Sequence, residues 1–259
     1  MQAHILPARH GWHWVRDAFA LWRKNPALLT FLVFGYWLVL VLIGSIPYLG
    51  QIAMSLAMPA LSVGIYNGCR AIDEGRKVGP ETLFSGFRQN LPEQLKLGAL
   101  YFTGTLLILG IISVFDGGEM AALMLGKSQL KADDPNNDVL LGSLLAGIAL
   151  STPLMMGYWF APLLCAWGRI SAPKAMFFSL VACWRNWRPF LYYACALMGV
   201  VTLAALALSL VALISPLLAA LPGLILPLLF MPICFASFYT NAVDIFGPIN
   251  PPRIIDERV

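Results

Sequence analysis

Long runs without charge dominate the pattern of hydrophobic and polar positions along this chain. No Asp, Glu, Lys or Arg occurs in residues 25–69, 97–115, 139–168 or 189–243. A helix needs about 20 apolar residues to cross the hydrocarbon core of a bilayer. The first and last runs are long enough for two spans each, and each middle run for one. The pattern therefore predicts six spans, at residues 27–46, 51–69, 95–115, 140–167, 190–213 and 221–243.

The lipid environment limits the secondary structure that a span can have. Backbone amides find no water in lipid, so a span must be a helix or part of a closed barrel. Continuous apolar runs rich in Leu and Ala, without ten-residue alternation, exclude the barrel. The first 26 residues are charged and aromatic, so we expect no cleavable signal peptide. We predict an all-α integral membrane protein of a single membrane domain, residues 1–259.

Three similar segments divide the chain into units. Residues 19–26 (FALWRKNP), 83–92 (LFSGFRQNLP) and 178–189 (FSLVACWRNWRP) each precede a span. The second span of each pair carries a proline before its final turns, at Pro59, Pro162 and Pro232. We predict three parallel repeats of an amphipathic interfacial helix plus a helical hairpin, at about residues 8–70, 81–168 and 172–245. The alternative is that there is no repeat and that these prolines only interrupt apolar helices.

Basic residues predict the orientation. In the six-span scheme, fifteen of the seventeen Lys and Arg lie on the side of the N-terminus, and only Lys127 and Lys131 lie opposite. Cytoplasmic loops carry the excess of Lys and Arg. We therefore expect a bacterial inner-membrane protein with cytoplasmic N- and C-termini, a periplasmic loop at residues 116–138 and a cytoplasmic tail at residues 246–259.

The cytoplasmic side is expected to carry a belt of basic and aromatic side chains. Such a belt suits contact with anionic phospholipid or docking of a protein partner, whereas topology determination alone needs no ligand. Its residues, called the belt below, are Trp12, Arg16, Trp22, Arg23, Lys24, Arg88, Trp184, Arg185 and Arg188.

The spans contain neutral polar groups but no charges. Transporters coupled to protons or ions usually need ionisable groups inside the membrane, so coupled transport is not expected. Asn67 and Asn241 occupy matching places in the first and third units. They are candidates for a polar pocket, or they hydrogen-bond helices to one another.

Metal and catalytic sites are not expected. His4, His10 and His13 are the only histidines, and no carboxylate or thiol stands near them at ligand spacing. Thioethers of span methionines such as Met54 and Met58 could bind Cu(I), but methionines in an apolar helix more often serve packing, as do the five dispersed cysteines. No catalytic triad, phosphate loop or cofactor fingerprint occurs. We expect no enzyme activity, no cofactor and no nucleic-acid partner.

Residues 11–14 (GWHW), 21–26 (LWRKNP), 83–87 (LFSGF) and 178–187 (FSLVACWRNW) carry a resemblance to known proteins. Over nearly its whole length the chain resembles an uncharacterised proteobacterial family of six-span inner-membrane proteins. It is more distantly similar to membrane regions fused to some glycerophosphodiester phosphodiesterases. The resemblance implies the fold and the inner membrane, and it transfers no functional residues.

Two functions are open at this point. The first is a non-catalytic accessory or scaffold subunit of a larger inner-membrane complex, which contacts anionic lipid or a partner through the belt. The alternative is an uncoupled permease or facilitator for a lipid or small solute.

Overall fold

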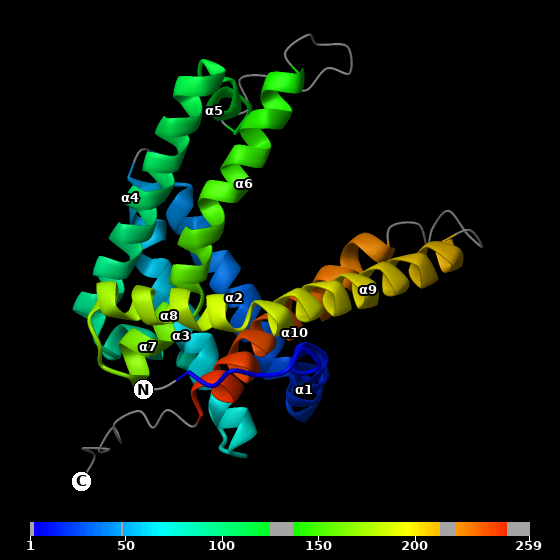
Figure 1. Cartoon of the computed structure of the whole chain (residues 1–259). Coiled ribbons are helices and arrows are strands. Elements are labelled where there is room, and N and C mark those ends of the chain that lie inside the picture. The colour runs from blue at the N-terminus through cyan, green and yellow to red at the C-terminus, as the bar shows by residue number, and fades with distance from the viewer. Residues whose placement is uncertain (1–2, 48, 125–136, 213–220, 248–259) are drawn as a thin grey trace.

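The computed structural model describes residues 3–47, 49–124, 137–212 and 221–247, and all regular structure in these ranges is helical (Figure 1). Most of the expected periplasmic loop, with Lys127 and Lys131, and residues 248–259 of the tail lie outside the described residues. The elements are α1 (His10–Lys24), α2 (Pro26–Gly44), α3 (Gly50–Asp73), η1 (Pro80–Arg88), α4 (Leu91–Asp116), α5 (Glu119–Met124), α6 (Asn137–Trp159), α7 (Ala161–Trp167), α8 (Ala172–Arg185), α9 (Trp187–Ala212) and α10 (Leu221–Phe246).

The prediction of six spans is confirmed. Six helical segments, α2, α3, α4, α6 with α7, α9 and α10, are long and apolar enough to cross a bilayer. The Asn-Pro pair ends α1 and starts α2. Asn25 caps α2 by accepting the backbone N–H of Leu28 at 3.1 Å, and Pro26 occupies the first turn, where a missing N–H is tolerated.

The fourth span, in which Pro153 and Pro162 predict kinks, is not one continuous helix. It breaks at Phe160, between α6 and α7. The backbone N–H of Phe160 is bonded to the hydroxyl of Ser179 in α8, at 2.9 Å, rather than within the helix. Pro162 then lies in the first turn of α7. The break therefore combines a proline, which lacks the N–H of a helix interior, with a contact from a distant helix.

Each of the three similar segments that precede a hairpin is called an introducing segment. The second of them, residues 83–92, also differs from its expected form. It is the 3-10 helix η1, not an amphipathic α-helix, and it packs into the bundle against α3. Leu83 is 2% exposed there. Gly64 and Gly86 allow this approach, because a Cβ on Gly64 would overlap the Leu83 carbonyl and a Cβ on Gly86 would overlap the Ala60 carbonyl.

The hairpins α2–α3, α4–α6 and α9–α10 are arranged in order around a ring. Each introducing segment packs on the preceding hairpin: η1 on α3, α8 on α6, and α1 on α9 and α10. Neighbouring hairpins meet through α3 with α4 and through α10 with α2. The third pair of hairpins meets where Trp159 of α6 packs edge-on against Phe190 of α9, with ring centroids 5.4 Å apart. Three copies of one unit would produce this repeated packing of an introducing segment on the preceding hairpin. The three-unit repeat and its boundaries stay a prediction.

The shared core lies at one end of the bundle, where α1, η1, α7, α8 and the last turns of α3 and α10 meet. We call this end the base. In the most apolar 18-residue stretch of each span, 56% of the residues are buried in α3 but only 6% in the fourth span and 6% in α9. Farther from the base, the α4–α6 and α9–α10 hairpins point in different directions (Figure 1). Lipid therefore faces most of α6 and α9.

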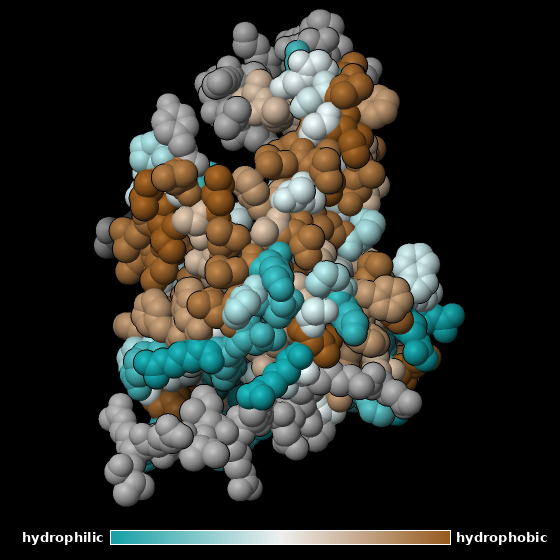
Figure 2. Space-filling model, turned by 90° about the vertical axis from the view of Figure 1, so that its left-hand side faces the viewer, coloured by the Kyte–Doolittle hydropathy of each residue, from teal (hydrophilic) through white to brown (hydrophobic). Residues whose placement is uncertain are grey.

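Hydrophilic side chains gather towards the base, and hydrophobic ones cover the surface above it (Figure 2). The described Lys and Arg all belong to the base elements, to the adjoining turns and loops, or to the first turns of α4 and α9. This separation is the one a bilayer imposes, because a charge in the hydrocarbon costs several kcal/mol, about 2.5–3.5 on insertion scales.

Candidate functional site

The belt residues lie on exposed parts of α1, η1, α8 and α9. Eight of the nine are exposed, and Trp22 is half-buried beside Thr30, with its indole nitrogen 3.4 Å from the hydroxyl. Trp184 is 73% exposed and Trp12 45%. These large rings on polar elements are available to a lipid headgroup layer, where Trp is enriched.

The basic members of the belt fall into two groups. Arg16 pairs with Asp17 at 2.9 Å and Lys24 with Asp73 at 2.8 Å. Within the described ranges, no salt bridge involves the other four, which are Arg23, Arg88, Arg185 and Arg188. Two of these lie near an aromatic ring: Arg23 is 6.0 Å from the Phe19 centroid and Arg188 is 5.4 Å from that of Trp187. The second group presents uncompensated positive charge.

Asn67 links elements of the first two hairpins. Its Nδ2 donates to the Ser85 hydroxyl at 2.7 Å, and its Oδ1 accepts the indole N–H of Trp167 at 2.9 Å. It thus joins α3 to η1 and α7. This geometry is that of a link between helices rather than of a pocket wall.

Asn241 is fully buried in α10, and neither its Oδ1 nor its Nδ2 has a partner among the described residues. Neither Asn241 nor Asn67 lines the two cavities considered below. The polar pocket at Asn67 and Asn241 stays a prediction.

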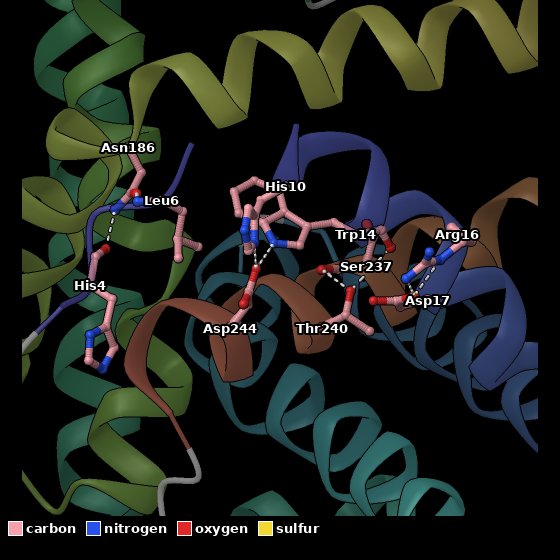
Figure 3. A network of polar contacts seen from close by, with 10 residues as sticks. All are labelled: His4, Leu6, His10, Trp14, Arg16, Asp17, Asn186, Ser237, Thr240 and Asp244. Atoms are coloured by element: carbon pink, nitrogen blue, oxygen red, sulfur yellow. Dashed lines mark hydrogen bonds and ion pairs between the residues drawn. The ribbon is translucent and has the colours of Figure 1, made fainter. Parts of the chain in front are cut away.

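A carboxylate that sequence spacing did not reveal holds α1 against α10. Asp244 Oδ2 lies 2.8 Å from His10 Nδ1 and accepts the indole N–H of Trp14 at 2.7 Å (Figure 3). Trp14 is 1% exposed and packs on Phe190, with ring centroids 5.2 Å apart. The chain separation of His10 and Asp244, 234 residues, conceals this pair from any local motif.

The segment before α1 is also attached to the rest of the base by hydrogen bonds. Asn186, between α8 and α9, accepts the backbone N–H of Leu6 at 2.9 Å and donates to the His4 carbonyl at 3.0 Å (Figure 3). The backbone N–H of His4 donates to the Ile245 carbonyl at 2.8 Å. The first and last described segments are therefore joined across the base.

A cavity of about 550 Å³ lies beside α1, between the ends of α3 and α10. Its polar walls are formed by His10, His13, Asp17, Lys24, Asp73 and Asp244. Its three carboxylates already have partners, Arg16, Lys24 and the His10–Trp14 pair. In the described ranges, no group of three or more His, Cys, Asp or Glu side chains is placed to hold a metal ion.

The cysteines are free thiols, and three of the five, Cys69, Cys165 and Cys183, are buried. Burial raises the pKa of the Cys183 thiol in α8 to about 12. The thiolate is the reactive form, so Cys183 is inert at neutral pH and packs as a small apolar group.

A second cavity, of about 190 Å³, lies between the three hairpins. Seven of its eleven lining residues are aromatic, and they come from α2, α3, α4, α6 and α10. Several of these rings touch: the centroids of Tyr101 and Tyr158 are 4.7 Å apart, and those of Trp159 and Phe238 also 4.7 Å. We call it the central aromatic pocket. The sequence analysis did not find it.

Comparison with known proteins gives the family. The chain is 33% identical over 262 residues to a probable inner membrane protein of Burkholderia thailandensis, covering 97% of this chain and 96% of that protein. No protein-family model matches the chain, and no solved structure matches it. The end-to-end relationship agrees with the six apolar helices of this chain, and the chain belongs to the same family of inner-membrane proteins as the Burkholderia protein.

Proposed function

We propose that the protein is a non-catalytic accessory or scaffold protein of the inner membrane that binds anionic phospholipid through the belt. The observation that carries this proposal is the group of four arginines without a salt bridge, set among exposed tryptophans at the base. In this proposal the base faces the cytoplasm, as the excess of basic residues favours.

The magnitude of the interaction favours several arginines acting together. A basic group near an anionic membrane surface contributes about 1 kcal/mol. Four such groups would therefore select anionic over zwitterionic lipid by several powers of ten if their contributions added, whereas one group alone would select it only about fivefold. The tryptophans place the charges at headgroup depth.

Charge removal in the belt tests the proposal. We expect Arg23→Gln/Arg185→Gln/Arg188→Gln to lose retained phosphatidylglycerol and cardiolipin, by about tenfold or more, in native mass spectrometry of the detergent-purified protein. The control is Arg9→Gln/Arg76→Gln/Lys77→Gln, which removes the same charge from exposed positions of the base outside the belt. Equal retention by both triple variants would contradict a role for the belt.

The same measurement addresses the scaffold role. A scaffold should leave the membrane with a stoichiometric protein companion, and the broad lipid-facing surfaces of α6 and α9 are where it would pack. Mild extraction from native membranes followed by mass measurement should give a particle heavier than one chain. A monomer free of companions would contradict the scaffold role.

A second candidate function is uncoupled facilitation of an apolar or amphiphilic solute. The central aromatic pocket between the hairpins favours it. Solute flux into proteoliposomes that exceeds flux into protein-free liposomes would support this candidate over a scaffold.

A further inference from the structure

A groove of about 340 Å³ follows the start of α9. One of its lining residues belongs to the segment before α1 and the others to α9; they are Ala8, Trp187, Arg188, Leu191, Tyr192 and Cys195. The α9 residues from Arg188 to Cys195 stand at positions i, i+3, i+4 and i+7, so they share one face of the helix. At a rise of 1.5 Å per residue this face extends for about 10 Å along the span.

The wall of the groove opposite α9 is held in place from both sides. Before Ala8, the backbone N–H of Leu6 donates to the side chain of Asn186 at 2.9 Å (Figure 3). After Ala8, α1 lies directly against the backbone of α9, because a Cβ on Gly11 would overlap the Pro189 carbonyl oxygen. The groove therefore has a fixed wall and does not depend on a ligand for its shape.

Only one end of the groove is charged. Arg188 is exposed, forms no salt bridge with any described residue, and lies 5.4 Å from the ring centroid of Trp187. Because α9 begins at Trp187, the positive end of its helix dipole lies beside the guanidinium. Leu191, Tyr192 and Cys195, farther along the face, are uncharged and exposed. The groove thus presents a positive end followed by an apolar face.

This arrangement matches an anion that is attached to an extended apolar chain. A small soluble anion would leave the apolar face uncovered. Apolar contact alone does not hold a chain in a bilayer, because the surrounding lipid tails are equally apolar. The charge of the headgroup must therefore supply the selectivity. A zwitterionic headgroup brings its own cation close to Arg188 and loses much of this attraction.

We propose that this groove holds one anionic phospholipid, with its phosphate at Arg188 and one acyl chain along the face from Leu191 to Cys195. The second acyl chain stays in the bilayer. The inference rests on the proposed binding of anionic phospholipid by the belt and goes further. It assigns a discrete lipid site to one arginine of the belt, where the belt proposal needs only the summed attraction of several.

The test is titration of the delipidated full chain in detergent with dioleoyl phosphatidylglycerol, with native mass spectrometry resolving each bound lipid. We expect Arg188→Gln to weaken binding of the first lipid by about fivefold, which corresponds to about 1 kcal/mol. Cys195→Trp fills the apolar face without changing charge and should weaken it by a similar factor. Arg23→Gln removes another belt arginine without a salt bridge, and Ala194→Trp adds the same ring at a neighbouring exposed position outside the groove. These two controls should bind the first lipid as the unmodified chain does.

Each outcome decides the proposal. Weakening confined to Arg188→Gln and Cys195→Trp, together with weaker first binding of dioleoyl phosphatidylcholine, supports the groove. Equal weakening in Arg188→Gln and Arg23→Gln, with Cys195→Trp binding as Ala194→Trp does, overturns the groove and leaves the belt proposal standing. An effect in only one of the two groove variants also overturns it, because the site needs both of its ends. No change in any of the four variants overturns it as well, and the triple variants then decide the belt proposal separately.

Discussion

Replacing Gly64 by alanine is expected to destabilise the protein by roughly 3 kcal/mol or more, the upper range for overpacking a tight interface. The new methyl group would overlap the carbonyl oxygen and carbonyl carbon of Leu83. These are backbone atoms, so no side-chain rotation relieves the collision, and η1 must move away from α3. The reciprocal contact of Gly86 with the Ala60 carbonyl would open with it.

The measurement is thermal unfolding in mild detergent, followed by the emission of the eight tryptophans. Gly110→Ala is the matched control, because nothing lies within 4 Å of its added Cβ. This control should be as stable as the unmodified chain or slightly more stable, since alanine favours a helix over glycine by about 0.5–1 kcal/mol. A Gly64→Ala protein as stable as Gly110→Ala would show that η1 does not pack against α3 in this way.

Replacing Asn67 by leucine should have the second largest effect, a loss of about 2 kcal/mol. The change removes both bonds of Asn67 and leaves the Trp167 indole N–H without its acceptor. Trp167 is only 4% exposed, so water cannot replace the lost partner. We expect α7 and η1 to loosen from α3 together.

Unfolding in detergent measures this loss, and Gln51→Leu serves as its control. Gln51 is exposed at the opposite end of α3, so its replacement removes a polar amide without breaking a link between elements. Limited proteolysis adds a second readout, with earlier cleavage expected between α7 and α8 in Asn67→Leu. Equal stability of the two variants would indicate that Asn67 is solvated and does not link α3 to η1 and α7.

The spans and their basic ends are predictable from sequence because the bilayer imposes both. A charge-free run as long as residues 25–69 is typical of membrane-spanning segments, and it is long enough for two spans. The helix start at residues 25–26 is likewise predictable, because Asn caps a helix and Pro, which lacks an N–H, is tolerated in its first turn. These features depend on neighbours along the chain.

The features that the sequence did not predict depend on contacts between distant residues. The break before Pro162 was predictable from that proline, but the bond from Phe160 to the hydroxyl of Ser179 on another helix was not. Likewise, η1 is a 3-10 helix while packed against Gly64. Asp244 joins His10 and Trp14 from the other end of the chain. No local pattern contains both partners of such a contact.

The central aromatic pocket was missed for a different reason. In a soluble helix an apolar stripe marks the inward face, but in lipid the outward face is apolar as well. Tyr36, Tyr101 and Tyr158 therefore looked like any other span residues, and only the packing of three hairpins places them around one cavity. Asn67 was singled out from sequence because it matches Asn241 in position within its unit, and its two bonds explain its presence.

The orientation of the base is the claim on which the belt proposal depends, and a dual reporter measures it directly. Green fluorescent protein, which fluoresces in the cytoplasm, and alkaline phosphatase, which is active only in the periplasm, are fused in turn after Val259 and after Leu130. We expect the Val259 fusion to fluoresce without phosphatase activity and the Leu130 fusion to show the reverse. An active phosphatase after Val259 would place the belt in the periplasm and contradict the proposed contact with the cytoplasmic leaflet.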